Sequence, residues 1–126
     1  MKRGDDMKIA FPAIEYNLNS IVDIRFGRAN QFILYDTESE KFIIIPNIQN
    51  IQAAQGAGIQ AAQIILNRGA QVLIAKNIGP KAFKVLEAVQ IAIYLAQEGT
   101  IQENIEYYKQ GKLKKTENSN VDGHWV

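Results

Sequence analysis

Two arginines, Arg25 and Arg28, flank Phe26 and Gly27 in a segment that shows no sustained hydrophobic periodicity. A guanidinium group stays charged at neutral pH and presents a planar fork of N–H donors that suits oxyanions. The glycine keeps the backbone adaptable, and the aromatic ring can anchor the segment in a core. The four residues are therefore candidates for binding an anionic ligand, although two arginines in one loop are often solvated surface groups.

Two predicted helix starts carry further candidates. Gly56 and Gly58 precede one helical pattern, and Gly79 precedes another, with Lys76 and Asn77 just before it. The free amides at a helix amino terminus favour an anion, and a nearby cation strengthens that preference. Ordinary capping by Gly-Pro is the alternative interpretation of the second start. The cofactor-binding candidates are thus Arg25, Phe26, Gly27, Arg28, Gly56, Gly58, Lys76, Asn77 and Gly79.

The stretch from Gly56 to Ala61 also fits the dinucleotide-binding pattern G-x-G-x-x-[GA]. Its context argues against that function, because nine residues separate Pro46 from Gly56, where the fingerprint requires a tight turn. The next strand also ends without the acidic residue that would bind a ribose. The glycines are better explained by helix entry and close approach to neighbouring backbone.

Side chains for catalysis or metal ligation are scarce. The chain has no cysteine, and its single histidine, His124, lies near the carboxyl terminus. His124 is therefore a weak candidate for a metal ligand. No nucleophile–histidine–acid set, HExxH motif or P-loop occurs. We predict no catalytic residues and a protein that is not an enzyme.

Length and composition predict one domain. A chain of 126 residues that is 47% hydrophobic can bury one sizeable core. A formal net charge of +1 gives no global attraction to nucleic acid or membranes, and no segment approaches the roughly 20 apolar residues of a membrane helix. We expect a cytoplasmic protein with a disordered amino terminus (1–6), a single α/β domain (7–113) and a flexible polar tail (114–126).

Hydrophobic patterning predicts the order β-β-β-α-β-α-β-α. Two apolar runs around a polar five-residue turn, 36–40, indicate a hairpin. The later strands alternate with helical patterns, which is typical of right-handed crossovers. A further short strand at 21–26 is left open. Five strands are expected at 7–13, 31–35, 41–46, 72–75 and 91–96, and helices are expected after Gly58, Gly79 and Thr100.

Such a mixed five-stranded sheet with flanking helices places the carboxyl ends of its first, third and fourth strands at one edge. That edge collects the loops 14–30, 47–58 and 76–79, which hold all nine candidates. Open α/β sheets bind ligands beyond the carboxyl ends of their strands. We therefore expect the binding site there.

Five segments of the chain carry a family pattern: 7–12, 22–29, 32–36, 56–58 and 78–83 with Leu86. The most specific part of the pattern is Phe26-Gly27-Arg28-Ala29. Together these segments resemble the dinitrogenase iron-molybdenum cofactor biosynthesis family, which includes NifX-like carriers and the carboxyl-terminal domain of NifB-like proteins. The resemblance extends from residue 7 to about residue 113.

The resemblance implies a ribonuclease H-like fold and a non-catalytic protein that holds an iron–sulfur or iron-molybdenum cluster precursor, with cofactor-assembly proteins as partners. In the family, the residue before Phe-Gly-Arg is commonly His, whereas here it is Arg25, which does not coordinate a metal while protonated. We therefore predict a carrier of a metal cluster or a small anion. The alternative is a protein–protein adaptor that kept the fold and lost cluster binding.

Overall fold

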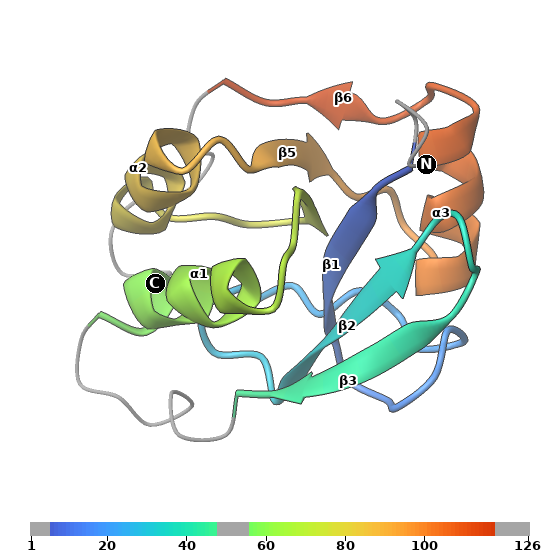
Figure 1. The fold of residues 1–126 in the computed structure, drawn as a ribbon, viewed down its shortest axis with the longest axis horizontal. Helices are drawn as coiled ribbons and strands as arrows, with labels where there is room; N and C mark the ends of the chain where they lie inside the picture. The colour runs from blue at the N-terminus through green and yellow to red at the C-terminus, as the bar shows by residue number, and fades with distance from the viewer. Residues whose placement is uncertain (1–5, 48–55, 118–126) are drawn as a thin grey trace.

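The chain folds around one mixed β-sheet in the computed structural model, which describes residues 6–47 and 56–117 (Figure 1). Within those residues the sheet has six strands in the order β3-β2-β1-β4-β5-β6. The strands are β1 (Lys8–Ala13), β2 (Gln31–Asp36), β3 (Phe42–Pro46), β4 (Val72–Ala75), β5 (Ala92–Leu95) and β6 (Lys114–Lys115), and the helices are α1 (Ala57–Asn67), α2 (Pro80–Ala88) and α3 (Ile101–Lys109).

Strand β1 lies at the centre of the sheet and sets the strand directions. It pairs antiparallel with β2 and parallel with β4. The antiparallel part continues to β3 and the parallel part to β5. Strands β1 and β4 are buried along nearly their whole length, which explains why they are continuous apolar runs rather than alternating ones. The predicted mixed sheet with flanking helices is confirmed.

The prediction of five strands was wrong, because β6 adds a sixth within the described residues. It pairs antiparallel with β5, with Lys114 opposite Leu95 and Lys115 opposite Tyr94. Hydrophobic patterning could not indicate it, since both of its residues are exposed lysines. Short, lysine-bearing strands are common at sheet edges, where they discourage further pairing. The predicted polar tail therefore begins with a strand.

The segment 21–26, which the sequence left open as a further short strand, does not form one. This segment makes only isolated bridges, of Val22 with Ala13 and of Ile21 with Thr100. Residues 1–5 and 118–126 lie outside the described residues, whereas Asp6 is described and is buried.

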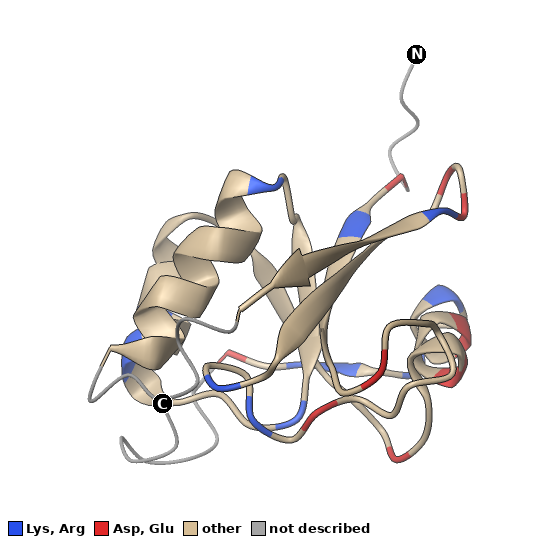
Figure 2. Ribbon diagram, turned by 90° about the horizontal axis from the view of Figure 1, so that it is seen from below, with Lys and Arg blue, Asp and Glu red and all other residues tan. Residues whose placement is uncertain are grey.

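Helices cover both faces of the sheet (Figures 1 and 2). On one face α1 and α2 bury Ile65 and Leu86 in a cluster with Phe32 from β2. On the other face α3 buries Ile105 in a cluster with Phe11 from β1. Each face is therefore closed by a helical layer. Among the described helices, none is long and apolar enough to cross a membrane.

Strands β1, β3, β4 and β5 run in the same direction, so their carboxyl ends share one edge. We call this the carboxyl edge. Helices α1, α2 and α3 follow β3, β4 and β5 in the chain, and each begins at this edge. The strand pairing thus confirms that the carboxyl ends of β1, β3 and β4 share one edge, whereas residues 48–55 of the predicted loop 47–58 lie outside the described residues.

Candidate functional site

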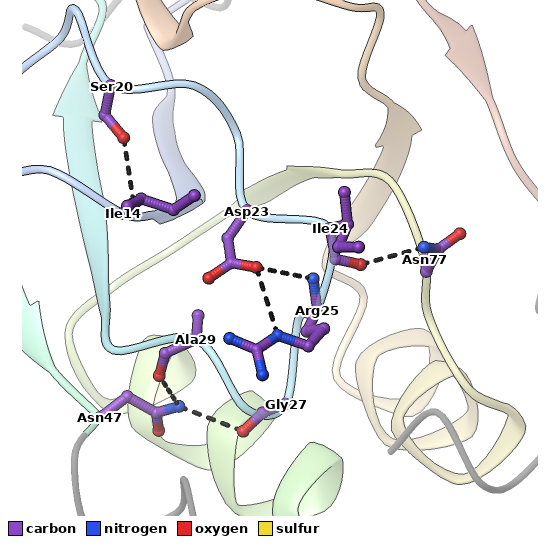
Figure 3. Close-up of polar contacts among 9 residues, drawn as sticks. All are labelled: Ile14, Ser20, Asp23, Ile24, Arg25, Gly27, Ala29, Asn47 and Asn77. Carbon is purple, nitrogen blue, oxygen red and sulfur yellow. Dashed lines mark hydrogen bonds and ion pairs between the residues drawn. The ribbon is translucent and has the colours of Figure 1, made fainter.

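The loop 14–30 is tied to the carboxyl edge by backbone and hydroxyl groups (Figure 3). The Asp23 amide donates to the Pro12 carbonyl oxygen at 2.9 Å. The Ser20 hydroxyl accepts hydrogen bonds from the amides of Ile14 and Glu15 at 3.0 and 2.9 Å. Buried hydroxyls that satisfy backbone amides stabilise irregular chain segments. The loop therefore has a defined shape.

Phe26 anchors the arginine-bearing part of this loop. Its side chain is buried, and its ring centroid lies 5.4 Å from that of Phe32 in a tilted contact. Aromatic pairs at this separation add to the stability given by burial alone. The structure therefore places Phe26 in the core, where it positions the neighbouring arginines rather than presenting its own ring to a ligand.

Gly27 lies directly against the first turn of α1. A Cβ atom on Gly27 would come within 2.7 Å of the Gly58 amide nitrogen and 2.8 Å of the Gly58 Cα atom. Side-chain carbons do not approach backbone that closely, so glycine is required by the close packing of the two segments. Two candidates that are distant in the sequence are thus in contact.

Asn47 holds the same turn from the other side (Figure 3). It is fully buried, and its Nδ2 donates to the carbonyl oxygens of Gly27 at 3.1 Å and Ala29 at 2.8 Å. A buried amide with two carbonyl acceptors fixes backbone that has no strand partner. Asn47 was not among the predicted site residues. The signal that could have found it is a polar side chain directly after a strand at the carboxyl edge.

Arg25 is partly neutralised by Asp23, a second residue that the prediction missed. The Arg25 amide donates to Asp23 Oδ1 at 3.0 Å, and the Arg25 Nε atom lies 3.7 Å from the same oxygen. The Asp23 side chain is 5% exposed, whereas that of Arg25 is 49% exposed. Figure 3 shows the guanidinium group folded back toward Asp23. Arg28, by contrast, is half-buried.

The segment before α2 also lies at the carboxyl edge. Asn77 Nδ2 donates to the Ile24 carbonyl oxygen at 3.1 Å, which links this segment to the arginine-bearing loop. Lys76 Nζ lies 2.6 Å from a carboxylate oxygen of Glu98. The ammonium group therefore already has an anionic partner, although Glu98 is almost fully exposed and could exchange it for a ligand.

Two helices begin at the carboxyl edge with glycine as the N-cap residue. In the described residues, neither Gly56 before α1 nor Gly79 before α2 provides a side-chain cap. Gly56 has a φ of 80°, in the left-handed region that favours glycine. The first amides of α1 have no intrahelical acceptor and receive none from the N-cap side chain, an arrangement that suits an anion.

Metal ligation by several side chains has little support in this part of the molecule. Across residues 6–47 and 56–117, no group of three or more His, Asp or Glu side chains could hold a metal ion. The chain also lacks cysteine. His124 lies outside the described residues. The residues at the carboxyl edge offer N–H donors and guanidinium groups, which are hydrogen-bond donors suited to oxyanions.

Comparison with known proteins identifies the family. Residues 7–111 match the dinitrogenase iron-molybdenum cofactor family. The chain belongs to this family. An uncharacterized protein from Methanocaldococcus jannaschii is 34% identical over 113 residues, which cover 88% of this chain and 92% of that protein. The family resemblance inferred from the sequence is confirmed.

Two solved structures support the same assignment. The apo form of the orange protein from Desulfovibrio gigas has a TM-score of 0.88 at 32% identity, covering 91% of this chain and 97% of that one. A NifB-like protein from Thermotoga has a TM-score of 0.80 at 35% identity, with the same coverage. Both likenesses extend over about nine-tenths of this chain.

Proposed function

We propose that this chain is a non-catalytic cytoplasmic carrier that holds an anionic ligand, specifically an iron–sulfur or iron-molybdenum cluster precursor, at the carboxyl edge. The observation that carries the proposal is the contact of Gly27 with Gly58. It brings the arginine-bearing loop beside a helix start that has no side-chain cap. The family description names the cofactor, and one relative was solved as an apo form, which also supports a ligand-carrying role.

The residues present favour one manner of binding. The amides at the start of α1 and the guanidinium groups of Arg25 and Arg28 would surround the anionic surface of the ligand. Ligand binding would compete with the contact between Arg25 and Asp23. Such a carrier binds and releases without breaking bonds in its cargo. We include a ribonuclease H-like fold in this proposal, supported by the strand order and directions.

The proposal is tested by anaerobic reconstitution with ferrous iron, sulfide and molybdate, followed by elemental analysis and visible spectroscopy. We expect stoichiometric metal and a new visible absorbance. Replacing both arginines, Arg25→Ala with Arg28→Ala, should weaken retention by about tenfold or more, because two charge-assisted donors are lost. The matched control is Arg68→Ala, which removes a cation just beyond the opposite end of α1 and should retain the cargo.

One combination of results would contradict the carrier proposal. Absence of metal uptake, together with unchanged molybdate and phosphate affinity in the double arginine variant, would contradict the carrier proposal. The adaptor alternative, in which the fold is kept without a ligand, would then be preferred.

A further inference from the structure

Among residues 6–47 and 56–117, strand β3 forms one edge of the sheet, and its outward backbone groups pair with no other strand of this part of the chain. The Asp36 amide donates to the Lys41 carbonyl oxygen at 2.9 Å, and the Asn47 amide donates to the Asn30 carbonyl oxygen at 3.0 Å. Hydrogen-bonded pairs alternate along an antiparallel ladder, so every second residue of β3 directs its backbone groups away from β2. Those residues are Phe42, Ile44 and Pro46.

A group of cations lies beside this edge, on the face covered by α1. Lys8 in β1 lies opposite Asp36 in β2, which in turn neighbours Lys41. A Cβ atom on Gly69 would lie 3.9 Å from Lys8 Nζ, which places this ammonium group at the carboxyl end of α1. Arg68 is the C-cap residue of the same helix. Lys8, Asp36, Lys41 and Arg68 line a cavity of about 300 Å³, together with Leu34 and Ile43.

The charge of this cavity is positive. Lys8, Lys41 and Arg68 contribute three positive charges and Asp36 one negative charge, which leaves a net charge of +2 (3 − 1) among its lining residues. Within the described residues, no ion pair engages any of the three cations. The Glu40 carboxylate, on the same hairpin, does not pair with these cations, because its Oε2 atom lies 4.0 Å from the Lys109 Nζ atom of α3.

An apolar side chain completes the surface. Ile43 is 43% exposed and lines the cavity next to the cations. Because side chains alternate along a strand, Lys41 and Ile43 lie on the same face, two residues apart. A strand added beside β3 would therefore place one of its side chains next to the Lys41 ammonium group and another, two residues away, next to the Ile43 side chain.

We propose that this basic edge, formed by β3 with Lys8, Lys41 and Arg68, binds an extended acidic segment of a partner protein by strand addition. The backbone of the segment would pair with the outward groups of Phe42 and Ile44. On the α1 face it would carry a carboxylate and an aliphatic side chain two residues apart. The cavity lies toward the amino end of β1, opposite the carboxyl edge, so the partner would leave the proposed cargo site uncovered.

A second copy of the chain fits this edge less well. In a two-fold antiparallel pairing of β3 centred on Ile43, Lys41 would lie opposite Ile45 of the other copy. Centred on Ile44, the pairing would place Lys41 opposite Asn47, and Phe42 opposite Pro46, which has no N–H to donate. Neither register supplies a carboxylate to the cations.

The test uses a fluorescein-labelled peptide, Thr-Asp-Thr-Val-Thr-Val-Thr, and the full chain, with binding measured by fluorescence anisotropy. We expect one-to-one binding that weakens as salt rises. A peptide with Lys in place of Asp should bind about tenfold more weakly or worse. Equal affinity for the two peptides, or no binding of either, would overturn the proposal.

Variants separate the two parts of the surface. Lys41→Glu with Arg68→Glu reverses two charges and should weaken binding of the Asp peptide about tenfold or more. Ile44→Pro removes an outward N–H without removing a bond to β2, and should have a similar effect while circular dichroism stays unchanged. The control Lys84→Glu, on the exposed side of α2, should bind normally. A concentration-dependent dimer of the wild-type chain that Ile44→Pro abolishes would overturn the proposal in favour of a second copy.

Discussion

Three helices begin at the carboxyl edge, and α3 begins differently from α1 and α2. At α3, the Thr100 hydroxyl accepts from the Glu103 amide at 3.0 Å, and the Glu103 carboxylate accepts from the Thr100 amide at 2.8 Å. In this capping box, the side chains of Thr100 and Glu103 accept hydrogen bonds from each other's backbone amides at the start of α3. In the described residues, α1 and α2 begin at glycines that supply no side-chain cap.

The difference separates a helix start that is capped by its own side chains from two whose N-cap residues provide no side chain. A reciprocal cap leaves α3 little to offer an anion, whereas the N-cap glycines of α1 and α2 give the first amides no side-chain acceptor. The two also differ from each other, because Pro80 occupies the first turn of α2 and has no amide hydrogen. We therefore expect α1, which contacts Gly27, to contribute more to ligand binding than α2.

The largest expected effect comes from separating α1 from the arginine-bearing loop. In Gly27→Ala, the new Cβ atom would meet backbone atoms of Gly58 within 3 Å, so one segment must move. We expect the free energy of unfolding to fall by about 3 kcal/mol, at the upper end of the usual range for overpacking. Urea denaturation followed by circular dichroism measures this change, and cargo retention should fall with it.

The control for this prediction is Gly111→Ala. Gly111 has a φ of 71°, but a Cβ atom there would meet nothing within 4 Å. Its substitution should cost about 1 kcal/mol, from left-handed backbone strain alone. Equal losses in the two variants would show that close approach to α1 is not what requires Gly27.

A smaller effect is expected from the amide that holds the loop turn. Asn47→Ala removes two buried hydrogen bonds and leaves the carbonyl oxygens of Gly27 and Ala29 without this donor. We expect a loss of about 2 kcal/mol in unfolding free energy. Asn77→Ala, which removes one bond to the Ile24 carbonyl oxygen from a less buried position, should cost less. If Asn77 proved the more costly, the loop would be held mainly from the α2 side.

The sequence was sufficient to predict the hairpin, the parallel crossovers and the edge where the loops meet. Strong apolar runs such as those of β1 and β4 determined these features, because a buried strand leaves few alternatives. The contact between Gly27 and Gly58 could not be predicted, since a glycine carries no sign of which backbone it faces. Strand β6 was missed because its two exposed lysines follow no hydrophobic pattern.

The polar contacts of the site could not be predicted from the sequence either. Arg25 was selected for its charge, but its position depends on Asp23, whose burial no local pattern indicates. Lys76 was selected likewise, and its partner Glu98 comes from a loop beyond the next strand. Pairings of this kind depend on side-chain geometry in the folded chain.

The capping box of α3 provides the next prediction. Thr100→Ala should lower the unfolding free energy by about 1 kcal/mol, because the Glu103 amide loses its acceptor. Thr100→Ser keeps the hydroxyl and should be close to wild type. Cargo retention, measured by elemental analysis after reconstitution, should be the same in both variants. Loss of cargo from Thr100→Ala at a temperature where it remains folded would contradict the division between α3 and the other two helix starts.

The smallest effect concerns the far end of α3 and depends on pH. Burial, and to a lesser extent the neighbouring Tyr94, raise the pKa of Tyr108 above its ordinary value of 10.0. The unfolded chain then loses this proton at a lower pH than the folded chain does. The stability that the neutral phenol contributes is fully present below pH 10 and is lost as the pH rises through the folded pKa.

Tyr108→Phe should therefore flatten the decline in unfolding free energy above pH 10, whereas Tyr16→Phe, at an exposed position, should leave it unchanged. Denaturation midpoints measured between neutral pH and pH 11 would show the difference. Tyr108 contacts Tyr94 edge-on, with ring centroids 5.2 Å apart, so the effect belongs to packing of α3 on the sheet. If cargo retention followed the same pH curve, α3 would contribute to the ligand site as well, and the contrast among the three helix starts would no longer hold.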